Sequence, residues 1–142
     1  MDEEYIKNLN YEEKLVFLKI FCKLVRSDGA IASEEIELLK SIAVRYGVAA
    51  DKMVEIIKTP NIDHIAEAAK IKDRHHALHL IRELCLFANV DNDLADNELD
   101  IVIDAARAMN VEDEKIILIN RFVLDSLILS KTGRIIMEED NG

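Results

Sequence analysis

The feature that most constrains this chain is an internal repeat. Displaced by 63 residues, the stretch 15–52 aligns with the stretch 78–115 without a gap. Apolar positions and several charged positions coincide together, a combination that chance rarely produces. The identical pairs are Leu15/Leu78, Cys22/Cys85, Asp28/Asp91, Ala32/Ala95, Glu35/Glu98, Ala43/Ala106, Val48/Val111 and Lys52/Lys115. We therefore interpret the chain as two copies of one motif, about 10–58 and 73–130, with approximate two-fold symmetry.

Each copy is predicted to form two helices joined by a turn. In the first copy, apolar residues recur at three- and four-residue intervals, which places them on one helical face. They are Leu15, Leu18, Phe21, Cys22 and Val25. Asn10 predicts the start of this helix, with Glu13 at the capping-box position. After a turn at 27–32, Ser33 is the predicted N-cap of the second helix and Gly47 its C-cap.

The second copy follows the same plan. Asp73 is the predicted cap of its first helix, and its second helix begins at Asp96. That helix closes at Asn110, which stands where the first copy has Gly47. Asparagine tolerates the left-handed backbone conformation better than most residues, so the two positions are expected to end their helices alike.

The remaining segments complete an all-α fold class. One Pro and four Gly are few turn-formers for a β-rich protein. Connecting helices are expected at about 51–58 and 62–70, and a last helix at about 112–130, after which Gly133 is expected to release a flexible tail, 131–142. The prediction is a single domain of about six or seven helices around one core.

Charge and hydropathy bound the partners. The net charge is −10, and a surface of that sign repels phosphate backbones, so no nucleic-acid binding is expected. Divalent cations or basic protein surfaces fit better. The acidic start has no apolar segment typical of a secretory signal, and the most apolar stretch, 116–129, is too short and too polar to span a bilayer. We expect a cytoplasmic protein without membrane insertion.

Each turn carries an Asp and, seven residues later, a Glu. These residues are Asp28 and Glu35 in the first copy and Asp91 and Glu98 in the second. Both Glu residues fall in the first turn of a helix, where the macrodipole stabilises negative charge. Both Asp residues fall at a helix C-terminus, where the dipole disfavours an anion. Each Asp therefore needs either a role in the turn or a cation.

Two interpretations of these carboxylates stay open. In one, each Asp organises its turn by bonding backbone N–H groups. In the other, the turns lie near each other and the four carboxylates supply hard oxygen ligands for Ca²⁺, Mg²⁺ or a similar ion, with Asp93 and Asp96 adding negative charge. An EF-hand is excluded, because Ala95 and Val102 stand where that loop needs oxygen ligands.

The segments 23–31 with Glu35, and 88–98, resemble the repeated acidic motif of the tellurite-resistance TerB family. In that motif a helix runs into small-x-Asp-Gly-x-aliphatic, and a Glu starts the next helix. The resemblance covers about 15–118, and Asn92 replaces the Gly in the second copy.

The resemblance implies an all-helical TerB fold and a role beside protein partners in tellurite resistance or a related stress response. It also implies a metal site whose ligands are Asp28, Glu35, Asp91 and Glu98. The leading hypothesis is a non-enzymatic, metal-responsive interaction module. The alternative is a purely structural helical adaptor without a metal site.

No catalytic residue is expected. His75 and His79 have a spacing that suits a metal, but the repeat aligns His79 with a core-like position, which favours a partly buried ring. Cys22 and Cys85 occupy apolar helix interiors, where a free thiol behaves as a small hydrophobe. We expect neither cysteine to act as a nucleophile.

The last predicted helix is apolar on more than one face. This pattern is usual for a central core helix, but it also fits a docking or dimer surface. The apolar tail residues Ile135, Ile136 and Met137 could reinforce either arrangement. The sequence alone leaves a homodimer open.

Overall fold

The structure, a computed structural model, describes residues 3–27, 29–89 and 96–141. These residues form helices and, among them, no strand, which confirms the all-α fold class. The helices are α1 (Glu3–Ile6), α2 (Tyr11–Arg26), α3 (Ser33–Arg45), α4 (Ala50–Lys58), α5 (His64–Ala68), α6 (Arg74–Ala88), α7 (Asp96–Ala108) and α8 (Asp113–Asn141). The predicted helices correspond to α2–α8, and the single turn α1 was not predicted.

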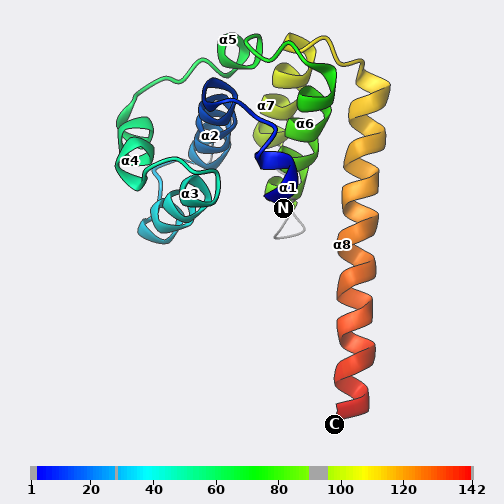
Figure 1. Ribbon diagram of the computed structural model, residues 1–142. Coiled ribbons are helices and arrows are strands. Elements are labelled where there is room, and N and C mark those ends of the chain that lie inside the picture. Colours follow the sequence, from blue (N-terminus) through cyan, green and yellow to red (C-terminus); the bar gives the residue numbers. More distant parts are fainter. Residues whose placement is uncertain (1–2, 28, 90–95, 142) are drawn as a thin grey trace.

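The central element of the bundle is α2 (Figure 1). It contacts α3, α4, α5, α6 and α7, so it meets apolar neighbours around most of its circumference. Its buried residues are Val16, Phe17, Leu18, Ile20, Phe21, Cys22, Leu24 and Val25. The predicted single face was therefore too narrow, and Leu15, assigned to it, is only partly buried.

The helix starts agree with the predicted caps at two of three places. Asn10 accepts from the Glu13 N–H at 2.8 Å while the Glu13 carboxylate accepts from the Asn10 N–H at 3.0 Å, which makes a complete capping box. Asp73 caps α6 as predicted. Ser33 is wrong as a cap, because it is already the first residue of α3 and Ala32 holds the cap position.

The ends of α3 and α7 share one left-handed residue. Gly47 has a φ of 77° and Asn110 a φ of 62°, which confirms the expected equivalence. In both helices the N–H of the next residue closes the end. Val48 donates to the Ala43 carbonyl at 2.8 Å, and Val111 donates to the Ala106 carbonyl at 3.0 Å. Both residues of the second bond lie 63 positions after those of the first. The helix bounds 33–45 and 96–108 differ by the same 63 residues. These offsets support the duplication, which stays an interpretation.

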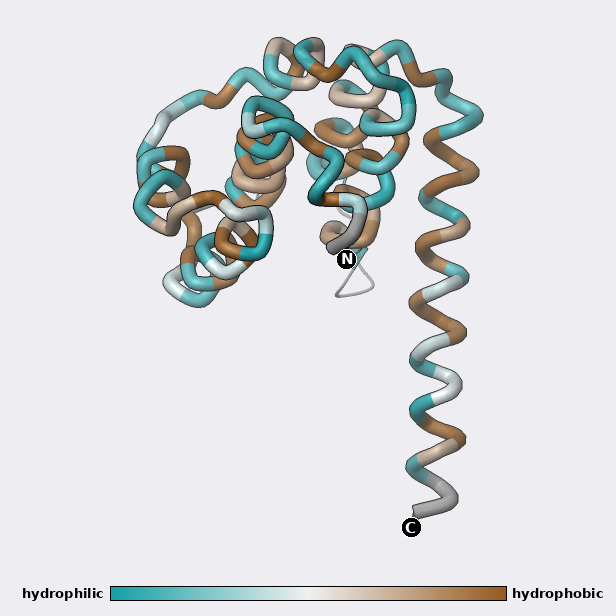
Figure 2. The backbone as a smooth tube through the Cα atoms, in the orientation of Figure 1, coloured by the Kyte–Doolittle hydropathy of each residue, from teal (hydrophilic) through white to brown (hydrophobic). Residues whose placement is uncertain are grey.

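The last helix departs from its prediction in length and in place. It continues through Gly133 to Asn141, because an isolated Gly costs a helix only about 1 kcal/mol. It lies at the edge of the bundle against α6 and α7, and its C-terminal half extends beyond the other helices (Figure 1). Apolar residues nevertheless recur along its whole length (Figure 2). The central-helix interpretation of this segment is therefore wrong.

Replacing Gly47 with Ala tests the left-handed helix end. A Cβ there would meet only the Lys14 Nζ, at 3.9 Å, so the cost is conformational and we expect a loss of about 1–2 kcal/mol in the free energy of unfolding. Urea unfolding followed by circular dichroism measures it. The control is Gly133→Ala. Gly133 has a helical backbone, and a Cβ added there would meet nothing within 4 Å, so this change should not destabilise the protein. Equal losses in both variants would contradict this account.

Candidate functional site

The structure describes two of the four predicted metal ligands. Asp28 and Asp91, like Asp93, lie outside the described residues. Glu35 and Glu98 are described, both half-buried, in the first turns of α3 and α7 as expected. The structure therefore bears on the proposed metal site through the two Glu residues and through the backbone beside the turns.

One hydrogen bond joins the two turn regions. The Asn97 side-chain amide at the start of α7 donates to the Ser27 carbonyl at the end of α2, at 2.7 Å. Ser27 directly precedes Asp28, and Asn97 directly precedes Glu98. The end of the first helix in one half thus lies beside the start of the second helix in the other half.

Glu35 has a structural partner. Its carboxylate Oε1 accepts from the Ala32 N–H at 2.9 Å, which is one of the two bonds of a capping box, whereas the Ala32 side chain has no acceptor for the other. Within the part of the chain that the structure describes, no three His, Cys, Asp or Glu side chains are close enough to hold a metal ion together. The described geometry accordingly supports capping by Glu35 more directly than ligation.

Two histidines of α6 lie beside carboxylates. His75 is exposed, whereas the His79 side chain is 9% exposed, lies 3.4 Å from Glu83 and stacks on Tyr5, which confirms the expected partly buried ring. His76, for which the sequence predicted no separate role, contacts the Glu13 carboxylate at 2.5 Å.

The cysteines are buried thiols. Cys22 is 0% exposed and Cys85 is 2% exposed. Burial raises the pKa of the Cys85 thiol to about 12. Burial also raises the pKa of Cys22, although the Arg26 guanidinium acts in the opposite direction. Both thiols therefore stay protonated near neutral pH, where a nucleophilic cysteine needs the thiolate.

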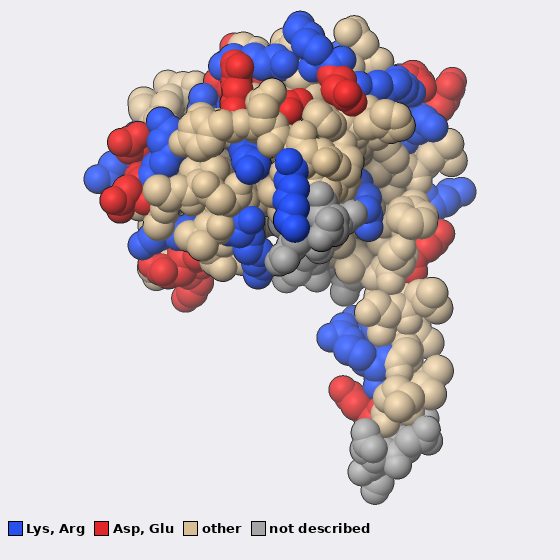
Figure 3. Space-filling view, viewed as in Figure 1, with Lys and Arg blue, Asp and Glu red and all other residues tan. Residues whose placement is uncertain are grey.

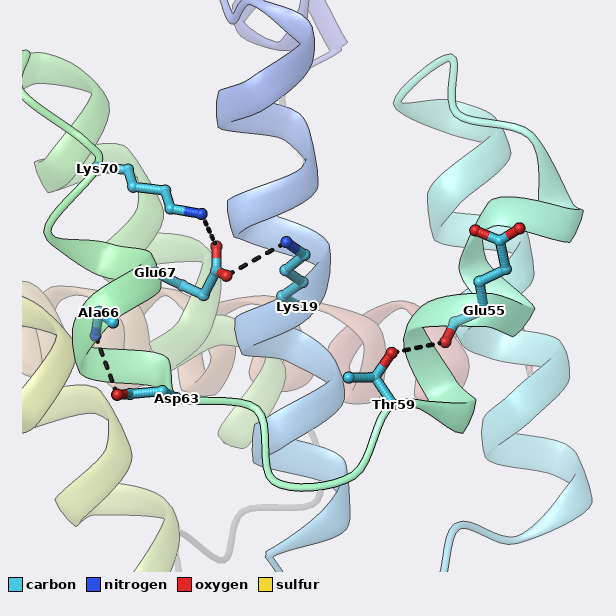
Figure 4. Close-up of polar contacts among 7 residues, drawn as sticks. All are labelled: Lys19, Glu55, Thr59, Asp63, Ala66, Glu67 and Lys70. Atoms are coloured by element: carbon cyan, nitrogen blue, oxygen red, sulfur yellow. Dashed lines mark hydrogen bonds and ion pairs between the residues drawn. The ribbon is translucent and has the colours of Figure 1, made fainter.

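A charged cluster between α2 and α5 has a structural explanation as well. The two oxygens of Glu67 contact Lys19 at 3.2 Å and Lys70 at 3.1 Å (Figure 4). The Glu67 side chain is only 17% exposed, and the two lysines balance its negative charge, so this carboxylate does not need a bound cation. Asp63 caps α5 beside it by accepting from the Ala66 N–H at 3.0 Å. This cluster positions α5 against α2.

The largest feature without a structural explanation is the exposed apolar surface of α8. Eight of the twelve exposed large hydrophobic side chains found in the described residues belong to this one helix. They are Ile117, Leu118, Phe122, Ile128, Leu129, Ile135, Ile136 and Met137. Figure 3 shows that uncharged side chains cover much of its projecting end. Large apolar patches on a folded chain mark interaction sites.

A groove of about 540 Å³ runs along one side of this helix, between α7 and α8. We call it the α7/α8 groove; its apolar walls are Leu99, Ile103, Ile116, Ile117, Leu124 and Ile128. At its rim Arg107 makes two bonds to the Asp113 carboxylate, at 3.0 and 2.8 Å, which link the end of α7 to the start of α8. The Arg107 guanidinium lowers the pKa of Asp113, so this link is charged at neutral pH.

Comparisons with protein-family models, with curated proteins and with solved structures gave no match. The TerB resemblance and the metal ligands that it implies therefore stay predictions. Among the described residues, no helix combines the length and apolar character needed to cross a membrane, the 29-residue α8 included.

Substitution of Glu35 separates its capping role from a ligand role. Glu35→Ala removes the acceptor of the Ala32 N–H, and we expect the free energy of unfolding to fall by about 0.5–2 kcal/mol. Glu35→Gln keeps an acceptor at the same place and should lose much less. Chemical denaturation without added metal measures both. Losses of the same size in both variants would mean that the carboxylate charge matters more than the cap.

A thiol reagent tests the burial of the cysteines. In the native protein at pH 7, we expect Cys22 and Cys85 to react with a disulfide reagent far more slowly than in denaturant, because both thiols are buried and protonated. Absorbance of the released thiolate follows the reaction. Rapid stoichiometric labelling of either cysteine under native conditions would refute this.

Proposed function

We propose that this chain is a non-enzymatic helical interaction module whose docking element is α8. The observation that carries the proposal is the concentration of exposed apolar side chains on that helix, beside an apolar groove. A helix laid into a groove is a common mode of protein recognition. The rest of the described surface supports the proposal by contrast, since its four other exposed large hydrophobics are divided among α2, α3 and α5.

The anchoring of α8 supports the same conclusion. Ile116 and Val123 are its buried residues, at 4% and 3% exposure, and they hold its N-terminal half on the bundle. The side chains from 128 to 138 are all exposed. We call this segment the free end of α8. An isolated helix of this length is marginal in water, because helical stability in proteins comes mainly from packing. A partner that covers the free end would supply that packing.

Site-specific photo-crosslinking in cells tests the docking role. A photoreactive residue at Ile128 or Leu129, which are 58% and 74% exposed, should give discrete protein adducts. The matched control is Val44 on α3, which is 60% exposed and lies away from α8. Adducts at the two α8 positions and none at Val44 are expected. The absence of adducts from α8, or the same adducts from all three positions, would refute the proposal.

A second candidate function is divalent-cation binding at the two acidic turns, in a TerB-like stress-response role. The bond between Ser27 and Asn97 favours it, because it brings one turn beside the helix start that carries Glu98. Asp28 and Asp91 would be the further ligands and Glu35 would serve through its second carboxylate oxygen. Hard carboxylate oxygens suit Ca²⁺ or Mg²⁺.

Calorimetric titration of Ca²⁺, Mg²⁺, Mn²⁺ and Zn²⁺ tests this candidate on chelator-treated protein. Saturable binding that Asp28→Asn/Asp91→Asn abolishes is the expected result. The control is Asp51→Asn/Asp63→Asn, which removes the same charge at two helix starts away from the turns. Equal loss in both double variants would show a diffuse charge effect. Heats that never saturate would leave these residues as turn-forming residues only.

A further inference from the structure

The apolar surface of α8 contains two separate stripes. On a helix of 3.6 residues per turn, Ile117, Leu124, Ile128 and Ile135 share one side, and this set is called stripe A. A second side carries stripe B, which consists of Leu118, Phe122, Leu129 and Ile136. Stripe A borders the α7/α8 groove, whose lining includes Ile117, Leu124 and Ile128. Stripe B lies about a third of a turn away, and its members Leu118 and Phe122 border Tyr5 and α6.

The spacing of stripe A reads the same in both directions. Its members are separated by seven, four and seven residues, whereas those of stripe B are separated by four, seven and seven. In an antiparallel pair of identical helices related by a two-fold axis, residue i meets residue j and residue j meets residue i. Stripe A meets this condition, because Ile117 falls opposite Ile135 and Leu124 falls opposite Ile128.

The same two-fold axis brings the α7/α8 groove of one protomer to the exposed free end of α8 of the other. Ile117 lies in the groove and Ile135 lies in the free end of α8. Pairing them places the free end of one protomer in the α7/α8 groove of the other, where Leu99 and Ile103 form the far wall. Stripe A spans about 27 Å of helix. The two-fold axis makes the contact between free end and groove twice, once in each direction.

We infer that the partner of α8 is a second copy of this chain, docked antiparallel through stripe A and the α7/α8 groove. This rests on the proposed docking role of α8 and names its occupant. The two-fold also places Arg121 of one helix opposite Lys131 of the other, and both lie on the same side as stripe A. Because these two side chains carry the same positive charge, their repulsion makes the dimer weaker than its apolar contacts alone would make it.

Sedimentation equilibrium of matched variants tests the interface. The wild-type chain should dimerise reversibly, and Ile128→Lys in stripe A should weaken the dimer by about a hundredfold, because the two-fold introduces the charge twice. The control is the adjacent Leu129→Lys in stripe B, which should change the constant by less than about twofold. Both side chains are exposed in the single chain, at 58% and 74%, so neither change should disturb folding.

Charge reversal tests the antiparallel register. Lys131→Glu turns two like-charge pairs into two attractive pairs with Arg121 and should tighten the dimer by about two- to tenfold. Lys58→Glu on α4 makes the same change in net charge away from α8 and should not tighten it. A parallel pair would set position 131 against itself and would gain nothing from Lys131→Glu.

Cysteine cross-linking gives an independent readout of direction. A mixture of Ile117→Cys and Ile135→Cys chains should form a mixed disulfide, and neither variant should cross-link with itself, since equal positions lie far apart in an antiparallel pair. The native Cys22 and Cys85 are buried and should not interfere.

The outcomes separate the inference from the function on which it rests. A monomeric wild-type chain at its highest soluble concentration, or a dimer broken by Leu129→Lys and not by Ile128→Lys, overturns the self-pairing. If α8 still cross-links to another protein in cells, the docking role survives that result. If α8 gives no adduct at all, both proposals fall.

Discussion

The structure depends on the burial of α2, because this helix supplies the surface on which most of the others pack. Phe17, Leu18 and Ile20 are all 0% exposed although they point in different directions around the helix. Burial on that scale is the dominant favourable contribution to folding. It also positions the proposed docking helix indirectly, since α6 and α7 pack on α2 and α8 packs on α6 and α7.

Local signals in the sequence predicted the helix starts and ends well. A capping box at Asn10 and a left-handed residue at Asn110 are set by a few neighbouring atoms, so spacing and residue type suffice. Ser33 was assigned wrongly because the helix begins one residue earlier than a Ser33 cap requires, with Ala32 at the cap and its N–H satisfied by the Glu35 carboxylate. The reach of Glu35 made a serine cap unnecessary.

Tertiary placement was less predictable. An apolar pattern on several faces describes both a helix surrounded by its own chain and one that awaits another chain, and α2 and α8 are these two cases. Gly133 does not end α8, since an isolated Gly costs a helix only about 1 kcal/mol. The closeness of Ser27 and Asn97 likewise needed the fold, because 70 residues separate them. Conversely, the palindromic spacing of stripe A was present in the sequence but had no meaning until the structure showed which side of α8 is uncovered.

The most direct test of this account is amide hydrogen exchange along 128–138 as a function of protein concentration. A helix end without tertiary contacts opens readily, whereas the same end packed in a partner groove opens only when the partner leaves. The account predicts that protection of the free end rises with protein concentration and disappears on dilution, while protection within α2 stays high. Fast exchange of 128–138 at every concentration would contradict it.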